Sequence, residues 1–247
     1  MSYLKVPNLP DREVTDVFVS CDIKYESLET LSKYGVNAIK IPQHNLLYDS
    51  VKSHPDMQVY HTGGNRILCE ENAKNSVAKL FPLKNICSGN RIGGSYPEDV
   101  AYNAARVGNF LICNIAFIAK EIIEEAKKDG LEIINVRQGY AKCNICIISE
   151  NAIITSDKGI VAALGNFPID VLFVDDSAVK LKNFCHGFIG GATGKISEDK
   201  LAVNGNIKLH KSCDEIINFA KKHLVEIISL NNGYLEDIGS ILPILVK

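Results

Sequence analysis

Cys143 is the residue of this sequence best suited to covalent chemistry. It follows Lys142 in the stretch QGYAKCNICIISENAIITSD, residues 138–157. A cysteine is a competent nucleophile only when a nearby cation or base holds it as the thiolate. Lys142 would point to the opposite face of a regular strand, so His61 or His186 would have to carry the proton. A structural role and a metal-binding role are the alternatives for Cys143.

Two carboxylates, Asp56 and Asp237, are candidates for binding a small cationic or amide-bearing ligand. With the planar amide of Gln58 they could hold a guanidinium or an amine through charge-assisted hydrogen bonds. Asp56 follows Pro55 in the run SHPDMQ, where a turn or a helix cap is the alternative explanation. The other polar candidates for the same site are Asp99, Asn103, Asn144 and Ser240.

The composition is that of an ordinary soluble globular protein, with 46% hydrophobic and 23% charged residues in a chain of 247. A net charge of −2 provides no basic face, so we expect no nucleic-acid partner. The apolar runs are too short to span a bilayer, and the N-terminal sequence lacks the apolar core of a signal peptide. We therefore expect a cytoplasmic protein with no membrane partner.

The eight cysteines are expected to be thiols, because nothing in the sequence indicates secretion. Cys143 and Cys146 form the only C-x-x-C pair, and residues three apart in a strand point to opposite faces. No second pair is present to complete a zinc site. We therefore expect neither a metal site nor a cofactor.

The candidate residues can act together only if the fold brings them to one place. The hydrophobic pattern predicts a hairpin from 145–148 and 152–155, then a short helix at 160–164 and a strand at 171–174. Units of the same strand–strand–helix–strand order are predicted elsewhere. Their elements are 57–61, 66–70, 75–81 and 85–88; 97–109, 110–114, 115–129 and 131–136; and 188–196, 201–204, 213–223 and 225–230.

The two chain ends supply the parts of one further unit. A strand, a helix and a strand are predicted at 16–21, 25–34 and 36–41 with no hairpin before them, and residues 235–246 add a strand with no helix after it. Counting these as one unit gives five repeats spaced about 40 residues apart, a period typical of propellers and solenoids. Pairing the chain ends would close a ring and remove the exposed sheet edges.

The predicted fold is therefore an α/β propeller with five-fold pseudosymmetry that forms a single domain, residues 1–247, with 1–15 as an extended arm. A three-layer α/β domain is the alternative, because it permits the same element order. In a propeller the first strand of each unit lines the central channel, so the polar candidates would converge there. Pro243 lacks an N–H and is expected at a bulge or at an unpaired ladder position.

This layout of repeats resembles the pentein fold of the guanidino-group-modifying enzyme superfamily over nearly the whole chain. The segments QGYAKCN with ITSD, HGFIGGATGKI and LEDIGSILPI are similar to a clostridial-type branch of penteins that lacks the usual catalytic set. The resemblance implies a small-molecule-binding protein, with a hydrolase or transferase acting on a guanidino, amidine or amide group through a cysteine. A non-catalytic binding factor, like the ribosome anti-association factors of this superfamily, is the alternative.

The catalytic pattern of these enzymes overlays only part of this sequence. Their acid precedes a Gly-Gly pair, which Thr62-Gly63-Gly64-Asn65 matches without the acid. Their histidine corresponds to Lys142-Cys143-Asn144, and their nucleophilic cysteine to Gly239-Ser240-Ile241. The resemblance thus adds Asn65 to the candidate ligand-binding residues, while the residues themselves leave Cys143 with His186, or with His61, as the candidate catalytic pair. No cysteine follows Cys213, so each member of the usual Cys–His–acid set is replaced.

Overall fold

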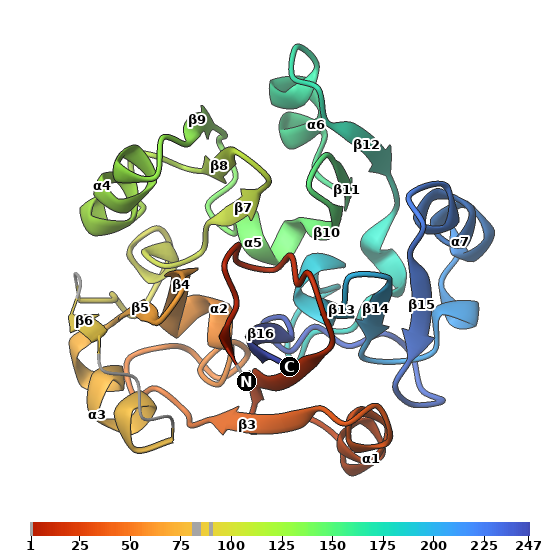
Figure 1. Cartoon of the computed structure of the whole chain (residues 1–247), viewed down its shortest axis with the longest axis horizontal. Helices are drawn as coiled ribbons and strands as arrows, with labels where there is room; N and C mark the ends of the chain where they lie inside the picture. The colour runs from red at the N-terminus through yellow and green to blue at the C-terminus, as the bar shows by residue number, and fades with distance from the viewer. Residues whose placement is uncertain (1, 81–84, 89–90) are drawn as a thin grey trace.

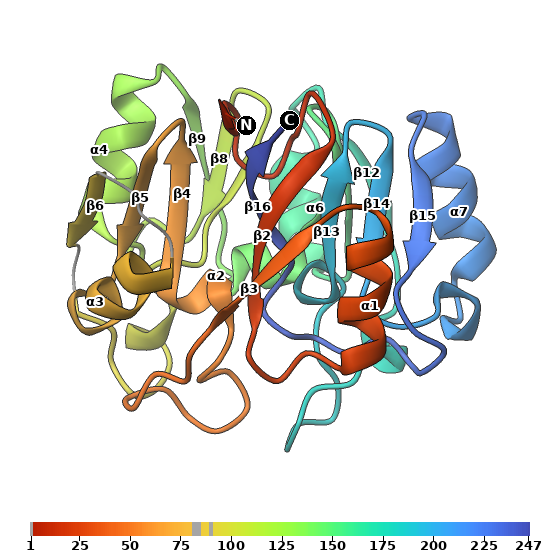
Figure 2. The ribbon, with the colours of Figure 1, turned by 60° about the horizontal axis from the view of Figure 1, so that its bottom comes forward.

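A computed structural model of the protein describes residues 2–80, 85–88 and 91–247. Within these residues the strands form four sheets of three strands and one of four, with helices between them, which gives a mixed α/β fold. Figure 1 shows the sheets arranged around the centre of the molecule, with the longer helices on the outside. The chain termini lie at one end of the molecule, and the long loop before α2 (Pro55–Gln58) lies at the other (Figure 2).

Each three-stranded sheet comes from one predicted strand–strand–helix–strand unit. The first contains β4 (Val59–Gly63), β5 (Arg66–Cys69), α3 (Glu71–Leu80) and β6 (Asn85–Ser88), and the second β7 (Ala105–Val107), β8 (Phe110–Cys113), α4 (Lys120–Lys128) and β9 (Glu132–Asn135). The third contains β10 (Cys146–Ser149), β11 (Ala152–Thr155), α6 (Lys158–Leu164) and β12 (Asp170–Phe173), and the fourth β13 (Thr193–Ser197), β14 (Lys200–Val203), α7 (Cys213–Lys222) and β15 (Glu226–Ser229).

The middle strand of each unit pairs with both of its neighbours. It is antiparallel to the strand before it, to which a short turn connects it, and parallel to the strand after the helix. This is the pattern expected when a tight turn makes the first connection and a helical crossover makes the second. The predicted hairpin of residues 145–155 is therefore confirmed as β10 and β11.

The four-stranded sheet combines both ends of the chain. Strand β16 (Leu242–Val246) lies antiparallel to β2 (Val14–Ser20), which is parallel to β3 (Asn37–Ile41) across α1 (Tyr25–Lys33). Pro243 is opposite Val17, and the register shifts between Pro243 and Leu245, so the proline borders an irregularity as predicted.

The N-terminal arm is fixed to the sheets rather than free. Its short strand β1 (Ser2–Tyr3) pairs with the outer side of β16. The buried Leu4 donates its N–H to Ile244 and accepts a bond from the N–H of Gly64. In Figure 1 the rest of the arm crosses the centre of the molecule.

Some predicted strands contain a single helical turn instead. Residues 57–58 lie in α2 (Pro55–Gln58), and residue 143 lies in α5 (Ala141–Asn144). The segments 97–109 and 188–196 likewise begin with short 3₁₀ turns, at 98–100 and 190–192, and become strands only at Ala105 and Thr193. Four residues are too few to show a helical period, and the apolar strand that follows obscures the turn.

Two helix predictions also need correction. The helix predicted at 115–129 begins only at Lys120, because residues 114–119 form a turn. The helix predicted at 75–81 lies within α3, and Phe81 falls outside the described residues. In the part of the chain that the structure describes, every helix is too short or too polar to cross a membrane.

Candidate functional site: a buried carboxylate–thiol cluster

Asp56 lies at the centre of a cluster of buried polar side chains. Its helix, α2, begins at Pro55, whose fixed φ suits the first helical position, and the Asp56 N–H donates to the Gly239 carbonyl at 3.2 Å. The Asp56 side chain is buried, and its Oδ2 accepts bonds from Cys143 Sγ at 3.2 Å and from Ser240 Oγ at 2.7 Å. Three segments far apart in the sequence thus meet at one carboxylate oxygen.

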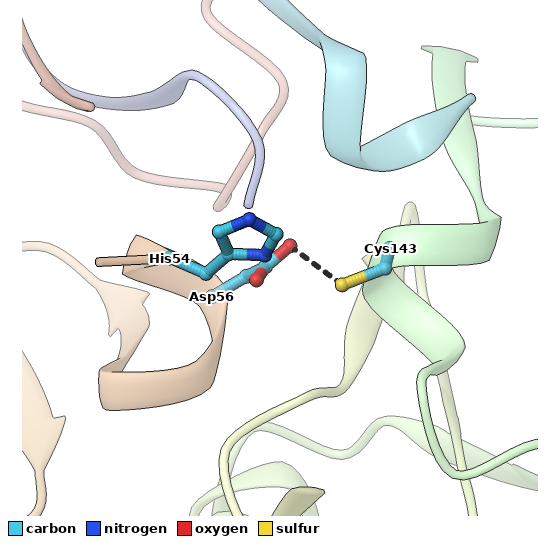
Figure 3. Close-up of side chains that lie close together, drawn as sticks. All are labelled: His54, Asp56 and Cys143. Carbon is cyan, nitrogen blue, oxygen red and sulfur yellow. Dashed lines mark hydrogen bonds between the residues drawn. The ribbon is translucent and has the colours of Figure 1, made fainter. Parts of the chain in front are cut away.

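Asn103 positions the Cys143 thiol. The Asn103 Oδ1 accepts the backbone N–H groups of Lys142 and Cys143 at 2.7 and 3.2 Å, so it caps the first turn of α5 from another segment. The Asn103 Nδ2 lies 3.1 Å from Cys143 Sγ and donates to it. With α5 held in this way, the thiol points at the Asp56 carboxylate (Figure 3).

Ser240 links the carboxylate to a buried ammonium group. It lies in a left-handed turn with Gly239, with φ values of +74° and +71°. Its Oγ accepts a bond from Lys142 Nζ at 2.8 Å and is 3.1 Å from the Gly190 carbonyl oxygen. Lys142, Ser240 and Asp56 are all buried, so this chain of an ammonium, a hydroxyl and a carboxylate is shielded from solvent.

Asp237 and His54 complete the cluster. The Asp237 carboxylate accepts the N–H of Phe188 and the N–H of Gly239, each at 3.0 Å. His54 Nδ1 is 3.8 Å from Asp237 Oδ1. Among the described residues, neither His54 Nδ1 nor Asp56 Oδ1 has a hydrogen-bond partner, although both atoms are buried. Figure 3 shows the His54 ring beside the Asp56 carboxylate.

Burial dominates the electrostatics of the cluster. It raises the pKa of the Cys143 thiol well above its usual value, and the neighbouring Asp56 carboxylate raises it further. Burial also raises the pKa of Asp56, and it raises the pKa of Asp237 to about 6. The pKa of His54 is lowered by the same cause. In this state the proton therefore resides on the sulfur, and His54 is neutral.

A cavity of about 20 Å³ reaches the cluster from the side of the N-terminal arm. Asp56 and Lys142 line its inner part, and Pro7 and Asn8 of the arm line it as well. This volume is about the size needed for one water molecule. A larger ligand can therefore enter from this side only if the arm moves.

Asp99 belongs to a neighbouring network and not to the cluster itself. Its Oδ2 accepts a bond from Tyr140 OH at 2.7 Å, and that hydroxyl lies 2.9 Å from Tyr48 OH. Burial raises the pKa of the Asp99 carboxyl, and the bond from Tyr140 opposes this. The network lies close to the thiol in the fold, because Tyr140 immediately precedes α5 and packs with Cys143 in one core cluster.

The structure brings Asp56, Asn103, Cys143, Asp237 and Ser240 together, but it places the other predicted site residues elsewhere. His186 is exposed, with Nδ1 3.0 Å from the Gly187 carbonyl, and Asn65 is exposed in the turn between β4 and β5. Gln58 donates to the carbonyls of Pro42 and Lys52, and Asn144 bonds Tyr140 and Ser156. His61 borders the cavity, with its Nε2 2.7 Å from the Gly64 carbonyl.

Sequence reasoning missed two members of the cluster. Lys142 was expected to face away from Cys143, which holds for a strand and fails for the helical turn α5. His54 directly precedes Pro55 and Asp56, and this His-Pro-Asp run was the only signal that could have identified it.

Comparisons with known proteins agree with this fold. The family model described as "Family of unknown function (DUF6873)" matches residues 18–242. No curated protein matches the chain.

Several solved structures are similar over most of the chain. One is SxtG, an amidinotransferase from Microseira wollei in the saxitoxin biosynthetic pathway, with a TM-score of 0.56, 11% identity and coverage of 92% of this chain and 91% of that one. Another is the dimethylarginine dimethylaminohydrolase of Pseudomonas aeruginosa in complex with citrulline. It has a TM-score of 0.54 and 10% identity, with coverage of 94% of this chain and 100% of that one. A third is the agmatine deiminase of C. jejuni with substrate bound. It has a TM-score of 0.56 and 12% identity, with coverage of 99% of this chain and 96% of that one. All three are members of the pentein superfamily, and at these identities the likeness establishes the fold.

Proposed function

We propose a function for this chain, which belongs to the family of unknown function DUF6873 and has the pentein fold. It binds a small cationic or amide-bearing molecule at the buried cluster and modifies a C–N group of that molecule through Cys143. One observation carries this proposal: Cys143 Sγ and Ser240 Oγ lie 3.2 and 2.7 Å from the same oxygen of Asp56. Burying carboxylates and an ammonium group in a core is costly, so their convergence favours a chemical role over a purely structural one.

The two carboxylates suit a cationic ligand. Asp56 and Asp237 are both buried, and Lys142 lies close enough to act electrostatically on each of them. A guanidinium or amidinium offers planar N–H groups that match a carboxylate in geometry and charge. The similar structures support this ligand class, because their descriptions name an amidinotransferase, an agmatine deiminase and a bound citrulline.

In the proposed reaction, Cys143 Sγ attacks the carbon of the amidine, guanidino or amide group. A C–S bond forms while the thiol proton passes to Asp56 Oδ2, 3.2 Å away, and the π electron pair of the attacked carbon moves onto its heteroatom. The pair on the heteroatom then re-forms the π bond as the C–N bond breaks, and the departing amine takes the proton from Asp56. Water or an acceptor amine finally attacks the same carbon, the C–S bond breaks, and a proton of the attacking molecule returns to Cys143 Sγ. Attack by water completes a hydrolysis, and attack by an amine completes a transfer.

Lys142 and Ser240 act as positioning residues in this scheme. The Lys142 ammonium group donates to Ser240 Oγ at 2.8 Å, and Ser240 contacts the Asp56 oxygen that receives the proton. The exposed His186, expected from the sequence to carry the proton, is replaced in this role by Asp56.

Ligand entry requires the N-terminal arm to move. The cavity beside Asp56 holds about 20 Å³, and Pro7 and Asn8 form part of its wall. A guanidino compound is much larger than one water molecule, so we infer that this part of the arm swings away when a ligand binds.

The architecture fits the same proposal. We infer that the five sheets are the blades of an α/β propeller and that residues 1–247 form one domain. In such a ring, the turn before the first strand of each blade points to the centre, and α2, α5 and the Gly239–Ser240 turn supply the cluster in this way. The alternative, a non-catalytic factor that binds a macromolecule, has no need of a buried carboxylate–thiol pair.

The test is turnover by purified protein of a panel of guanidino, amidino and amide compounds, with ammonia or amine release as the readout. Cys143→Ala is expected to lose about a thousandfold or more in kcat/KM, because the attacking atom is removed. Cys185→Ala removes an exposed thiol and is the matched control, expected to keep full activity. Unchanged turnover in Cys143→Ala would remove this cysteine as the nucleophile.

A further inference from the structure

Three side chains of the cluster offer the donor atoms of a metal site. A ring nitrogen of His54, a carboxylate oxygen of Asp56 and Sγ of Cys143 lie within 4.8 Å of one another, and all three residues are buried. Figure 3 shows the three side chains gathered around a common point, His54 and Asp56 from one segment and Cys143 from α5. Tetrahedral Zn²⁺ spaces its nitrogen, oxygen and sulfur ligands about 3.3–3.8 Å apart, given its usual bond lengths. Small side-chain movements would therefore close this set around an ion.

Two of these three residues each carry a buried atom with unmet bonding capacity. His54 Nδ1 and Asp56 Oδ1 are buried without a hydrogen-bond partner among the described residues. Such atoms carry the full cost of leaving water without a compensating bond. A cation bound by His54, Asp56 and the thiolate would supply both residues with a further partner.

The formal charges of the cluster favour a divalent cation. Counted as formal charges, the two carboxylates of Asp56 and Asp237 and the ammonium of Lys142 leave one net negative charge in a buried setting. An ion of charge +2 that displaces the Cys143 proton brings the total to zero. Neutral totals are strongly preferred where solvent is excluded.

We propose that His54, Asp56 and Cys143 form a binding site for a soft divalent cation, with Zn²⁺ as the first candidate. Thiolate, imidazole and carboxylate are the ligands that zinc combines in proteins. Asp237, with Oδ1 3.8 Å from His54 Nδ1, is positioned to supply the fourth ligand. This differs from the expectation drawn from the sequence, where metal binding was an alternative role for Cys143 but no metal site was expected. A bound ion would occupy Cys143 Sγ and Asp56, so a chain that holds the ion would not carry out the reaction proposed above. The metal site rests on the geometry of the cluster and not on turnover of any substrate.

Binding is tested on the full-length chain after chelation, with Co²⁺ as a spectroscopic probe and Zn²⁺ as the competitor. We expect one Co²⁺ per chain, a sulfur-to-cobalt charge-transfer band together with the visible bands of a tetrahedral ion, and displacement of both by Zn²⁺. A folded wild-type chain that shows no such bands overturns the proposal.

Variants identify the ligands. Cys143→Ser is expected to lose the charge-transfer band, and His54→Gln to weaken binding by about a hundredfold. Cys185→Ser, at an exposed thiol, is the matched control and should keep all bands. Circular dichroism establishes that each variant is folded. A band that survives in Cys143→Ser, or disappears in Cys185→Ser, contradicts the assignment, whatever the outcome of the turnover assays.

Discussion

Asp56 and Ser240, 184 positions apart in the sequence, share a hydrogen bond of 2.7 Å between Ser240 Oγ and Asp56 Oδ2. This bond joins α2, which precedes β4, to the Gly239–Ser240 turn, which precedes β16. A backbone hydrogen bond connects the same two segments, because the Asp56 N–H donates to the Gly239 carbonyl. The geometry of the cluster thus depends on a connection between its most distant segments.

Replacing Ser240 separates two contributions to stability: the hydrogen bonds of its hydroxyl group and the strain of its left-handed backbone. Ser240→Ala leaves the Lys142 ammonium and the Asp56 carboxylate without this partner, which is expected to cost about 1–3 kcal/mol of unfolding free energy. Ser240→Gly loses the same bonds but relaxes a backbone with φ +74°, so it should be about 1 kcal/mol more stable than the alanine variant. Urea unfolding measures both, and an alanine variant as stable as the glycine variant would show that the left-handed turn carries no strain.

The C-terminal strand is expected to be essential for stability. A chain that ends at Asn232 loses β16, in which Leu242, Ile244 and Val246 are buried against β2 and its neighbours. Their burial is worth several kcal/mol at about 25 cal/mol per Å² of apolar surface, and the truncation also leaves β2 as an open edge. Thermal melting should show no cooperative transition near the parent temperature. The control chain lacks only the exposed Lys247, and equal melting of both chains would refute the role of β16.

His61 should make the protein less stable in mild acid. Burial lowers the pKa of His61 from 6.5 to about 4, so between these values the unfolded chain binds a proton that the folded chain does not. The unfolding free energy contributed by His61 therefore falls as pH decreases from 6.5 to 4, by about 3 kcal/mol in total.

Denaturant titrations at several pH values test this effect. His61→Gln can still donate to the Gly64 carbonyl. Its unfolding free energy should fall less steeply as the pH decreases from 6.5 to about 4. His186→Gln, at an exposed position, should follow the wild type. A wild-type slope unchanged by His61→Gln would exclude this histidine as the source.

Gly191 is expected to tolerate no side chain. A Cβ at this position would overlap the Asp237 carboxylate, so Gly191→Ala must displace Asp237 or the turn at 190–192 and should cost about 1–3 kcal/mol. At Gly165 the nearest atom to an added Cβ is the Ala162 carbonyl oxygen at 3.5 Å, and Gly165→Ala should be neutral or stabilise by about 0.5 kcal/mol. Calorimetric melting of the pair checks the difference, and equal melting temperatures would show that the turn adapts freely.

The sheets could be predicted from the sequence because their signals are local. The apolar runs at 145–148 and 152–155 flank a polar turn, and the pattern places both strands of the hairpin correctly. The chain-end unit was also predictable, because residues 235–246 lack the helix that residues 16–41 possess. Elements of this length contain enough residues to display their period.

The centre of the molecule was harder to predict, because its turns are short and its contacts are distant. Four residues of α5 decide that Lys142 faces Ser240 rather than the opposite side, and nothing local indicates them. Gln58 and Asn144 belong to plausible polar stretches, yet each bonds to loops or neighbouring turns that only the folded chain brings near. Polar residues in such turns reveal their partners only through tertiary structure.

The pairing of the chain ends also has a consequence for biosynthesis. Strand β2 ends at Ser20 and its partner β16 begins at Leu242, so 222 positions separate them. At 5–20 residues per second, a translating ribosome needs roughly 11–45 s to cover that distance. Throughout this time β2 waits for β16, and Asp56 waits for Ser240 over most of it. The emerging polypeptide therefore exposes an unpaired apolar edge of β2 until β16 has been made, which is the kind of surface that holding chaperones recognise.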